Sequence, residues 1–357
     1  MINERRYFHT FNSLRFFSFL LVFVSHIPND KSSLISFFSK SGGIGVSFFF
    51  VLSGFLITYI LMFEKINKDK ISLKKFFARR ILRIWPLYYA MILFAFLTPY
   101  ILEFLNLPSS DEGYEPNLLT SMLFLENYKM MYTGSFPNAS PLRVMWTICV
   151  EEYFYLIWGI IFYFISAKKT PILIGICIIT ANIFRIIYNH YGIYSYDIFS
   201  NIDYFAYGAI PAYILLYKST YLDKIEKISL NIKYILLFIT IALIFVIPNI
   251  KLGWITYFSP TIYGILFSTV ILFTLPSSNF IHIKDKYLIS KLGIFTYGLY
   301  LIHTIIINLL LQTKNMFPFE INWFILATLS LILTILISIS SYHLFEKHFL
   351  KLKKYFY

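Results

Sequence analysis

The sequence predicts an all-α integral membrane protein with about ten transmembrane helices. Of its 357 residues, 58% are hydrophobic and only 14% are charged, whereas a soluble protein of this size needs more charge on its surface. Apolar runs of about 20 residues, long enough to cross the hydrocarbon core of a bilayer, recur from Phe11 to near Phe345. No polar stretch exceeds about 40 residues, which is too short for a hydrated domain.

The apolar runs divide the chain into ten predicted spans. The seventh and eighth spans nearly touch around Pro248–Trp254, so the division there is the weakest. The predicted spans cover residues 11–28, 44–63, 84–106, 145–166, 171–188, 200–217, 234–250, 252–275, 293–312 and 322–345.

The basic residues alternate between the loops. One set of loops holds 23 Lys and Arg and the other holds 6, with Arg15 and Arg185 inside spans. Because loops rich in Lys and Arg stay in the cytoplasm, we predict that both termini are cytoplasmic. The same placement explains the net charge of +13, which we therefore do not attribute to nucleic-acid binding. Cys149 and Cys177 lie in apolar segments, which predicts small core residues and no disulfide.

Arg15 and His26 lie inside the first predicted span, near its two ends, and the sequence from Leu14 is LRFFSFLLVFVSH. His26 lies eleven residues after Arg15, so the helical rise puts it roughly 16 Å closer to the outer face and about 20° from the same direction. Both side chains are therefore predicted to face one groove, separated along its length. The structural alternative is an interfacial Arg that snorkels and a His that is satisfied in the core.

Three arginines precede the third predicted span, in the stretch FFARRILRIWPLYY. Arg79 and Arg83 are four residues apart, so they share a helix face. Arg80 lies between them. Anchoring at the cytoplasmic side explains ordinary basic loops, but arginines without lysine favour planar, multidentate binding of phosphate.

Glu151 and Glu152 fall in the outer half of the fourth predicted span, at the depth predicted for His26. Adjacent helical residues point about 100° apart, so only one of the two carboxylates can easily face the groove. Tyr155 follows Glu151 by one turn. Since a buried carboxylate needs a cationic or hydrogen-bonding partner, His26 is one candidate partner for Glu151.

Two weaker features lie in later spans. Arg185 and Asp203 are predicted to form a structural ion pair, an interpretation we favour over acceptor binding. The stretch FTYGLYLIH offers Tyr297, Tyr300 and His303. Aromatic residues are common at membrane interfaces, so this stretch alone decides little.

Taken in order, six elements of the sequence resemble those of acyltransferase family 3, a family of integral-membrane O-acyltransferases. They are Arg15 and His26 with ten residues between them, GGIGVSFFFVLSGFLIT, RRILRIWPLYY, WTICVEEYFY, LGIFTYGLYLIH and FEKHF. The fourth element has Thr147 and Cys149 in the family's serine positions and Tyr153 in its glutamine position, and it keeps Glu151. The resemblance covers nearly the whole chain.

The resemblance implies transfer of an acyl group, usually acetyl from cytoplasmic acetyl-CoA, to a hydroxyl of a cell-envelope sugar, at the cytoplasmic membrane of a bacterium. The CoA phosphates would be bound by Arg15, Arg79, Arg80 and Arg83. The length of helix between Arg15 and His26, roughly 16 Å, is similar to the length of the pantetheine arm of CoA. His26 would act as general base or receive the acyl group itself, and Glu151 would orient the imidazole or stabilise its cation.

The remaining residues of these elements are expected to contact the substrates. They are Ser53, Trp146, Glu152, Tyr155, Tyr297 and His303. We expect an acyl-CoA, an envelope glycan acceptor and the lipid bilayer as partners, and neither a metal nor nucleic acid. Residues 1–357 are expected to form a single membrane-embedded acyltransferase domain without an appended soluble domain.

Two other functions remain open from the sequence. A polysaccharide or sugar exporter would need a water-filled path with polar residues along many helices, whereas polarity is concentrated here in the first, third and fourth spans. A structural scaffold would have no use for Arg15 and His26 in register. The acceptor sugar, the acyl group and the oligomeric state do not follow from the sequence.

Overall fold

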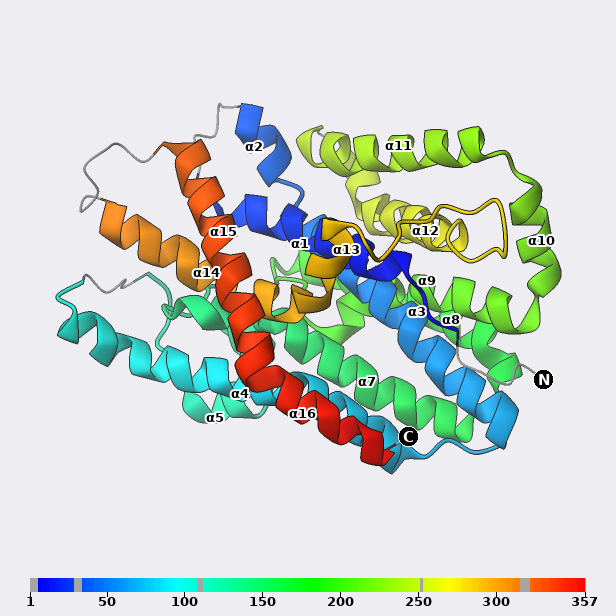
Figure 1. The fold of residues 1–357 in the computed structure, drawn as a ribbon, viewed down its shortest axis with the longest axis horizontal. Coiled ribbons are helices and arrows are strands. Elements are labelled where there is room, and N and C mark those ends of the chain that lie inside the picture. Colours follow the sequence, from blue (N-terminus) through cyan, green and yellow to red (C-terminus); the bar gives the residue numbers. More distant parts are fainter. Residues whose placement is uncertain (1–5, 29–33, 108–111, 251–252, 315–321, 357) are drawn as a thin grey trace.

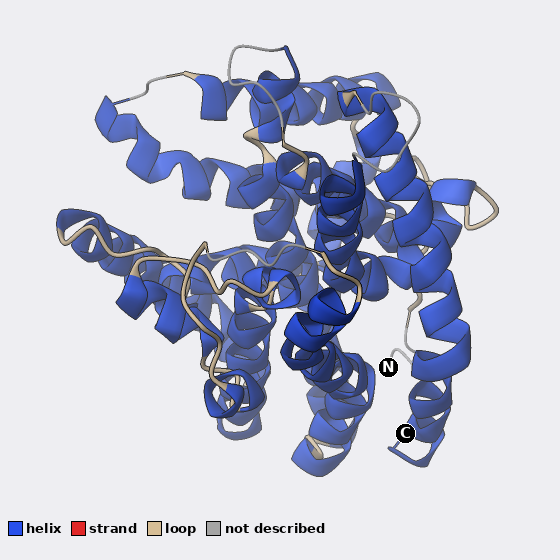
Figure 2. Cartoon of the chain, turned by 90° about the vertical axis from the view of Figure 1, so that its left-hand side faces the viewer, coloured by secondary structure: helices blue, strands red, loops and turns tan. Residues whose placement is uncertain are grey.

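The computed structural model describes residues 6–28, 34–107, 112–250, 253–314 and 322–356, which form an all-α bundle (Figure 1). Within these ranges the backbone forms no β-strand beyond an isolated bridge between Tyr114 and Pro137 (Figure 2). The α-helices of the first half are α1 (Thr10–His26), α2 (Leu34–Ser39), α3 (Gly42–Lys68), α4 (Leu73–Phe104), α5 (Leu118–Met122), α6 (Glu126–Thr133), α7 (Trp146–Phe164) and α8 (Thr170–His190). Those of the second half are α9 (Ile198–Tyr217), α10 (Ser219–Lys227), α11 (Leu230–Val246), α12 (Ser259–Leu272), α13 (Leu288–Leu292), α14 (Thr296–Thr313), α15 (Trp323–Ser341) and α16 (Lys347–Lys351).

Each predicted span contains most of one helix, which confirms the all-α membrane class. Among the described residues, seven helices are long and apolar enough to cross a membrane. Three predicted spans fall outside this set. Helices α1 and α12 are shorter, with 17 and 14 residues, and α9 carries the polar residues Asn201 and Asp203. The number of helices that cross the bilayer, and the side on which each end lies, therefore remain predictions.

Helix α4 begins earlier than the span predicted for it. It starts at Leu73, where Ser72 caps the helix by accepting a hydrogen bond from the backbone N–H of Lys75. The prediction began at residue 84 because charged residues lower the mean hydropathy before it. The three arginines therefore lie inside a helix rather than in a loop, and its rotation fixes where each one points.

Helix α3 lies at the centre of the bundle, in contact with α1, α7, α9 and α12. Small residues allow its closest contacts. A Cβ added at Gly54 would lie 2.2 Å from the carbonyl oxygen of Phe205 in α9. Conversely, a Cβ added at Gly208 of α9 would lie 2.0 Å from the carbonyl oxygen of Val51. The two helices meet backbone to backbone, as transmembrane helices do where small residues face one another.

Helix α1 is held between α3 and α14. On one side, Gly45 of α3 lets the helix approach the Ser18 backbone. On the other side, Phe16, Phe19 and Phe23 belong to a buried apolar cluster that includes residues of α14. This two-sided packing fixes the rotation of α1 and with it the directions of its polar side chains.

The segment between α4 and α7 is folded and contains a buried carboxylate. Glu126 is fully buried, and it accepts hydrogen bonds from Tyr114 Oη (2.5 Å) and Ser121 Oγ (2.6 Å). The hydroxyl of Tyr88 in α4 donates to the Ser121 carbonyl. Burial and the adjacent Glu126 carboxylate raise the pKa of Tyr114 above its ordinary value, so this phenol keeps its proton and the hydrogen bond it donates.

Two structural predictions are confirmed. Arg185 and Asp203 form a two-bonded ion pair between α8 and α9, with Nη1–Oδ2 and Nη2–Oδ1 distances of 2.7 and 2.5 Å. The Asp203 side chain is completely buried. Cys149 and Cys177 are both buried as free cysteines.

The contact between α3 and α9 predicts a strong effect of one added methyl group. Gly208→Ala should lower the melting temperature of the purified protein in detergent, because overpacking of a well-packed interface costs about 1–3 kcal/mol. Gly175→Ala in α8 is the matched control, because a Cβ there meets no atom within 4 Å. Equal melting temperatures of the two variants would show that α3 and α9 are not in close contact.

Candidate active site

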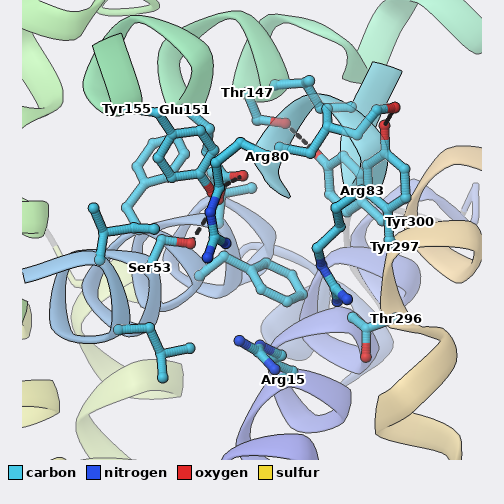
Figure 3. A pocket seen from close by; sticks show the side chains of 17 residues that line it. Arg15, Ser53, Arg80, Arg83, Thr147, Glu151, Tyr155, Thr296, Tyr297 and Tyr300 are labelled. Atoms are coloured by element: carbon cyan, nitrogen blue, oxygen red, sulfur yellow. Dashed lines mark hydrogen bonds between the residues drawn. The ribbon is translucent and has the colours of Figure 1, made fainter. Parts of the chain in front are cut away.

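A cavity of about 120 Å³ lies between α1, α3, α4, α7 and α14. Its polar lining residues come from all five helices, and its apolar walls are Val46, Phe49, Phe50 and neighbouring side chains. Figure 3 shows the residues of this cavity. It gathers residues from five of the six elements singled out in the sequence.

One wall of the cavity is cationic. Arg15 of α1 and Arg80 and Arg83 of α4 all line it, and in Figure 3 their side chains extend toward a shared space. Arg15 Nη1 also lies 3.5 Å from the side-chain oxygen of Asn12. Three guanidinium groups at one cavity favour a ligand with several anionic oxygens, since each offers a planar set of N–H donors.

Glu151 also lines the cavity and is held by two hydroxyl groups. Ser53 of α3 donates to Oε1 and Tyr155 donates to Oε2, both at 2.9 Å. The pairing of Glu151 with Tyr155 was predicted from their spacing and is present. Both oxygens are thus oriented by neutral donors, and the carboxylate shares the cavity with Arg15 and Arg83.

Residues of α7 and α14 form another part of the lining. Thr147 Oγ1 donates to Tyr300 Oη at 3.0 Å, the contact drawn as a dashed line in Figure 3. Phe49 packs edge-on against the Tyr300 ring, with 6.0 Å between centroids. Tyr297 also lines the cavity and donates to the Ile84 carbonyl at 2.7 Å.

His26 and His303 form a pair beyond Tyr300. Their rings are 4.9 Å apart and nearly perpendicular, with His303 Nε2 3.4 Å from His26 Nδ1. His303 is completely buried, whereas His26 is exposed at the end of α1. The aromatic rings of Phe19 and Phe23 also contact His303.

The contacts of this pair assign its tautomers. His303 Nδ1 lies 2.7 Å from the Tyr300 carbonyl oxygen, so Nδ1 carries the proton and Nε2 presents a lone pair to His26. His26 Nδ1 lies 2.8 Å from the Val22 carbonyl oxygen and faces that lone pair, so it carries a proton too. The lone pair of neutral His26 is therefore on Nε2, which makes Nε2 its basic and nucleophilic nitrogen.

The structure corrects the expectation that Arg15 and His26 face one groove. Arg15 lines the cavity and His26 does not. Tyr300 lines it too, and the Tyr300 carbonyl contacts His303, the partner of His26. Nor does a hydrogen bond join Glu151 to His26 among the described residues. Their partners are Ser53 and Tyr155 for the first and Val22, Ser25 and His303 for the second.

Arg79 also differs from its expected placement. Its Nη2 lies 3.7 Å from Glu64 Oε2, with both side chains buried, and its Nη1 donates to the Phe356 carbonyl at 2.6 Å. Arg79 thus joins α4 to α3 and to the segment after α16, whereas Arg80 and Arg83, one turn apart, face the cavity.

Two further predicted residues lie off the cavity. Glu152 accepts a hydrogen bond from Trp85 Nε1 at 3.2 Å. The Trp146 ring packs against Tyr196, with 4.6 Å between centroids. Neither Glu152 nor Trp146 is among the lining residues. No group of three or more His, Cys, Asp or Glu that could hold a metal ion occurs in the described part of the chain.

Some lining residues were not singled out from the sequence. A second cavity shares Arg15, Arg80 and Arg83 with the first, and it adds Arg6 and Lys353. Arg6 and Lys353 looked like ordinary cytoplasmic anchors in the sequence, because their position in a basic loop and a basic tail carries no further signal.

Comparison with known proteins identifies the family. A family model described as an acyltransferase domain matches residues 8–343. The chain belongs to this family. No solved structure shows a significant match.

Two bacterial proteins show the extent of the similarity. The peptidoglycan O-acetyltransferase OatA of Listeria monocytogenes is 30% identical over 196 residues, which cover 52% of this chain and 30% of that protein. The O-acetyltransferase OatA of Staphylococcus aureus is 26% identical over 171 residues, which cover 46% of this chain and 26% of that protein. The match thus spans under a third of either relative.

The contacts of Arg79 and Arg80 predict different effects of the same change. Arg79→Gln leaves Glu64 buried without its ion-pair partner, which should cost about 3–5 kcal/mol and lower the melting temperature in detergent. Arg80→Gln, the matched control at the cavity wall, should shift the melting temperature much less. A larger loss from Arg80→Gln would reverse the assignment of the two arginines.

Proposed function

We propose that this chain transfers an acyl group, usually acetyl, from a cytoplasmic acyl-CoA to a hydroxyl of a cell-envelope glycan. Membership of the acyltransferase family is the premise, and the names of the relatives favour acetyl as the acyl group and peptidoglycan as one acceptor. A lipid-linked precursor of a surface polysaccharide offers the same hydroxyl chemistry. The protein would lie in the cytoplasmic membrane of a bacterium.

One observation carries the proposal. A cavity lined by three arginines lies next to a pair of histidines whose rings are oriented by hydrogen bonds. Tyr300 belongs to both, since its ring lines the cavity and its carbonyl fixes His303. An anionic donor on one side and a base on the other are the two parts that acyl transfer requires.

Acetyl-CoA fits the donor side by the chemistry of the lining residues. Arg15, Arg80 and Arg83 would bind the phosphates, and the largely apolar walls beyond them suit a narrow, uncharged arm. Glu151, with both oxygens oriented by hydroxyl groups, would accept a hydrogen bond from an amide N–H of that arm. We assign Glu151 to the donor because its contacts lie in this cavity.

The proposed reaction uses His26 Nε2 as the general base. It takes the proton from the acceptor hydroxyl while the hydroxyl oxygen forms a bond to the acyl carbon. The bond between that carbon and sulfur breaks, and the leaving thiolate takes the proton back from His26. His303 is a positioning residue, because its Nε2 keeps the His26 proton on Nδ1 and stabilises the imidazolium that forms.

The two substrates would approach from opposite sides. The exposed face of His26 suits entry of the acceptor, and the cavity suits entry of the donor. They can meet only if the Thr147–Tyr300 contact opens. A cavity that stops at this contact favours an enzyme over an exporter, because an exporter needs a continuous polar path.

His26→Ala should abolish acylation while the protein remains in the membrane at normal abundance. The side chain is exposed at the end of α1, so its loss removes the base with little loss of packing. The measurement is base-labile acetate on envelope glycan from cells that carry each form. His190→Ala, at the exposed end of α8, is the matched control. Wild-type acetylation by the His26 variant would disprove the assignment of the base.

Arg83→Lys should lower the affinity for the acyl donor without changing the orientation of the protein in the membrane. The charge is kept, so the topology signal is unchanged, but the planar pair of donors is lost. Loss of one charge-assisted phosphate bond corresponds to about ten- to hundredfold in the apparent KM for acetyl-CoA. Arg15→Lys should behave in the same way.

The measurement for both lysine variants is acetyl-CoA kinetics in inverted vesicles, with cysteine accessibility as the check on topology. An unchanged KM in both variants would mean that these arginines do not bind the donor.

A further inference from the structure

Five basic side chains line the second cavity, which shares Arg15, Arg80 and Arg83 with the first. Its volume is about 290 Å³, and its cations are Arg6, Arg15, Arg80, Arg83 and Lys353. No Asp or Glu occurs among its described lining residues. Mutual repulsion of cations is relieved when an anion binds between them, so the composition points to a polyanionic ligand.

The two cavities give these cations an order. Arg15, Arg80 and Arg83 line both cavities and therefore lie where the cavities join. Arg6 and Lys353 line only the second cavity of this pair, on the side away from Glu151 and Tyr300. A ligand whose arm fills the first cavity meets the shared arginines first and then Arg6 and Lys353.

Contacts far apart in the sequence hold Lys353 at this position. It belongs to the short 3₁₀-helix Leu352–Phe356 after α16. The carbonyl of Phe356 accepts the hydrogen bond from Arg79, whose guanidinium is also paired with Glu64. The buried Arg79 therefore fixes the turn that carries Lys353.

Arg6 is also fixed by contacts from other elements. Its backbone N–H donates to Tyr59 Oη of α3 at 2.9 Å, and its Nη2 donates to the Pro276 carbonyl at 3.2 Å. Arg6 and Lys353 are thus brought to one cavity from opposite ends of the sequence.

We propose that Arg6 and Lys353 form a separate phosphomonoester subsite that binds the 3′-phosphate of the CoA ribose. The proposal rests on the proposed function. CoA carries a pyrophosphate next to its pantetheine arm and a third phosphate on the far side of the ribose. With the arm in the first cavity, the pyrophosphate meets Arg15, Arg80 and Arg83, and the 3′-phosphate meets the two outer cations.

The test compares CoA with dephospho-CoA, which lacks only the 3′-phosphate. Binding of each nucleotide to the purified full-length protein is measured by competition with labelled CoA, alongside the apparent KM for their acetyl thioesters. Lys353→Met and Arg6→Gln are the test variants. Lys354→Met is the matched control, because Lys354 is exposed on the same turn and does not line the cavity.

Wild-type protein should prefer CoA by about tenfold, on the order of one charge-assisted phosphate contact. Both test variants should lose most of this preference through weaker binding of CoA, with dephospho-CoA affected less than about threefold. Lys354→Met should retain the preference. Unchanged melting temperatures would confirm that the variants fold.

Three outcomes would overturn the proposal, and they are distinguishable. Equal binding of both nucleotides by the wild type would leave the donor assignment standing and remove the subsite. An equal loss of both nucleotides in Lys353→Met would mean that Lys353 does not read the 3′-phosphate, as expected if it contacts an anionic lipid. Binding of neither nucleotide by the wild type would remove the CoA donor itself and the subsite with it.

Discussion

Charged side chains inside a bilayer need partners within the protein, and this requirement determines how the helices of this bundle are joined. The buried Asp203 is matched by Arg185 across α8 and α9. In the same way Glu64 is matched by Arg79 across α3 and α4. In each case the ion pair determines which two helices are neighbours and how each helix is rotated about its axis. These pairs explain why polar residues in apolar helices need not indicate catalysis.

At the cavity, several positive charges gather around one space. Arg15 and Arg83 approach one space from α1 and α4, and the carboxylate of Glu151 in the same lining is held by hydroxyl groups. Retaining this arrangement is costly in a low dielectric unless an anion completes it. The same constraint that makes the other ions structural therefore favours the proposed anion site at this group.

The sequence predicted the order of the helices because apolar runs are local properties of the chain. It did not distinguish Arg79 from Arg80, since the direction of each depends on how α3 and the segment ending at Phe356 fix the rotation of α4. The partner of His26 could not be predicted from the sequence either, because His303 is 277 positions away and the contact depends on the packing of α1 against α14. The sequence thus shows which ionisable side chains are present, whereas the partner of each side chain depends on the tertiary structure.

The packed layer of Phe49, Thr147 and Tyr300 has a consequence for the energetics of the cell. It separates a cation-lined cavity from an exposed imidazole. A continuous file of water between them would let protons run down the membrane potential, which is worth about 2.3 kcal/mol per charge for each 100 mV. The packed layer, backed by guanidinium groups that repel hydronium, would oppose such a proton leak while the proposed acyl transfer takes place across it.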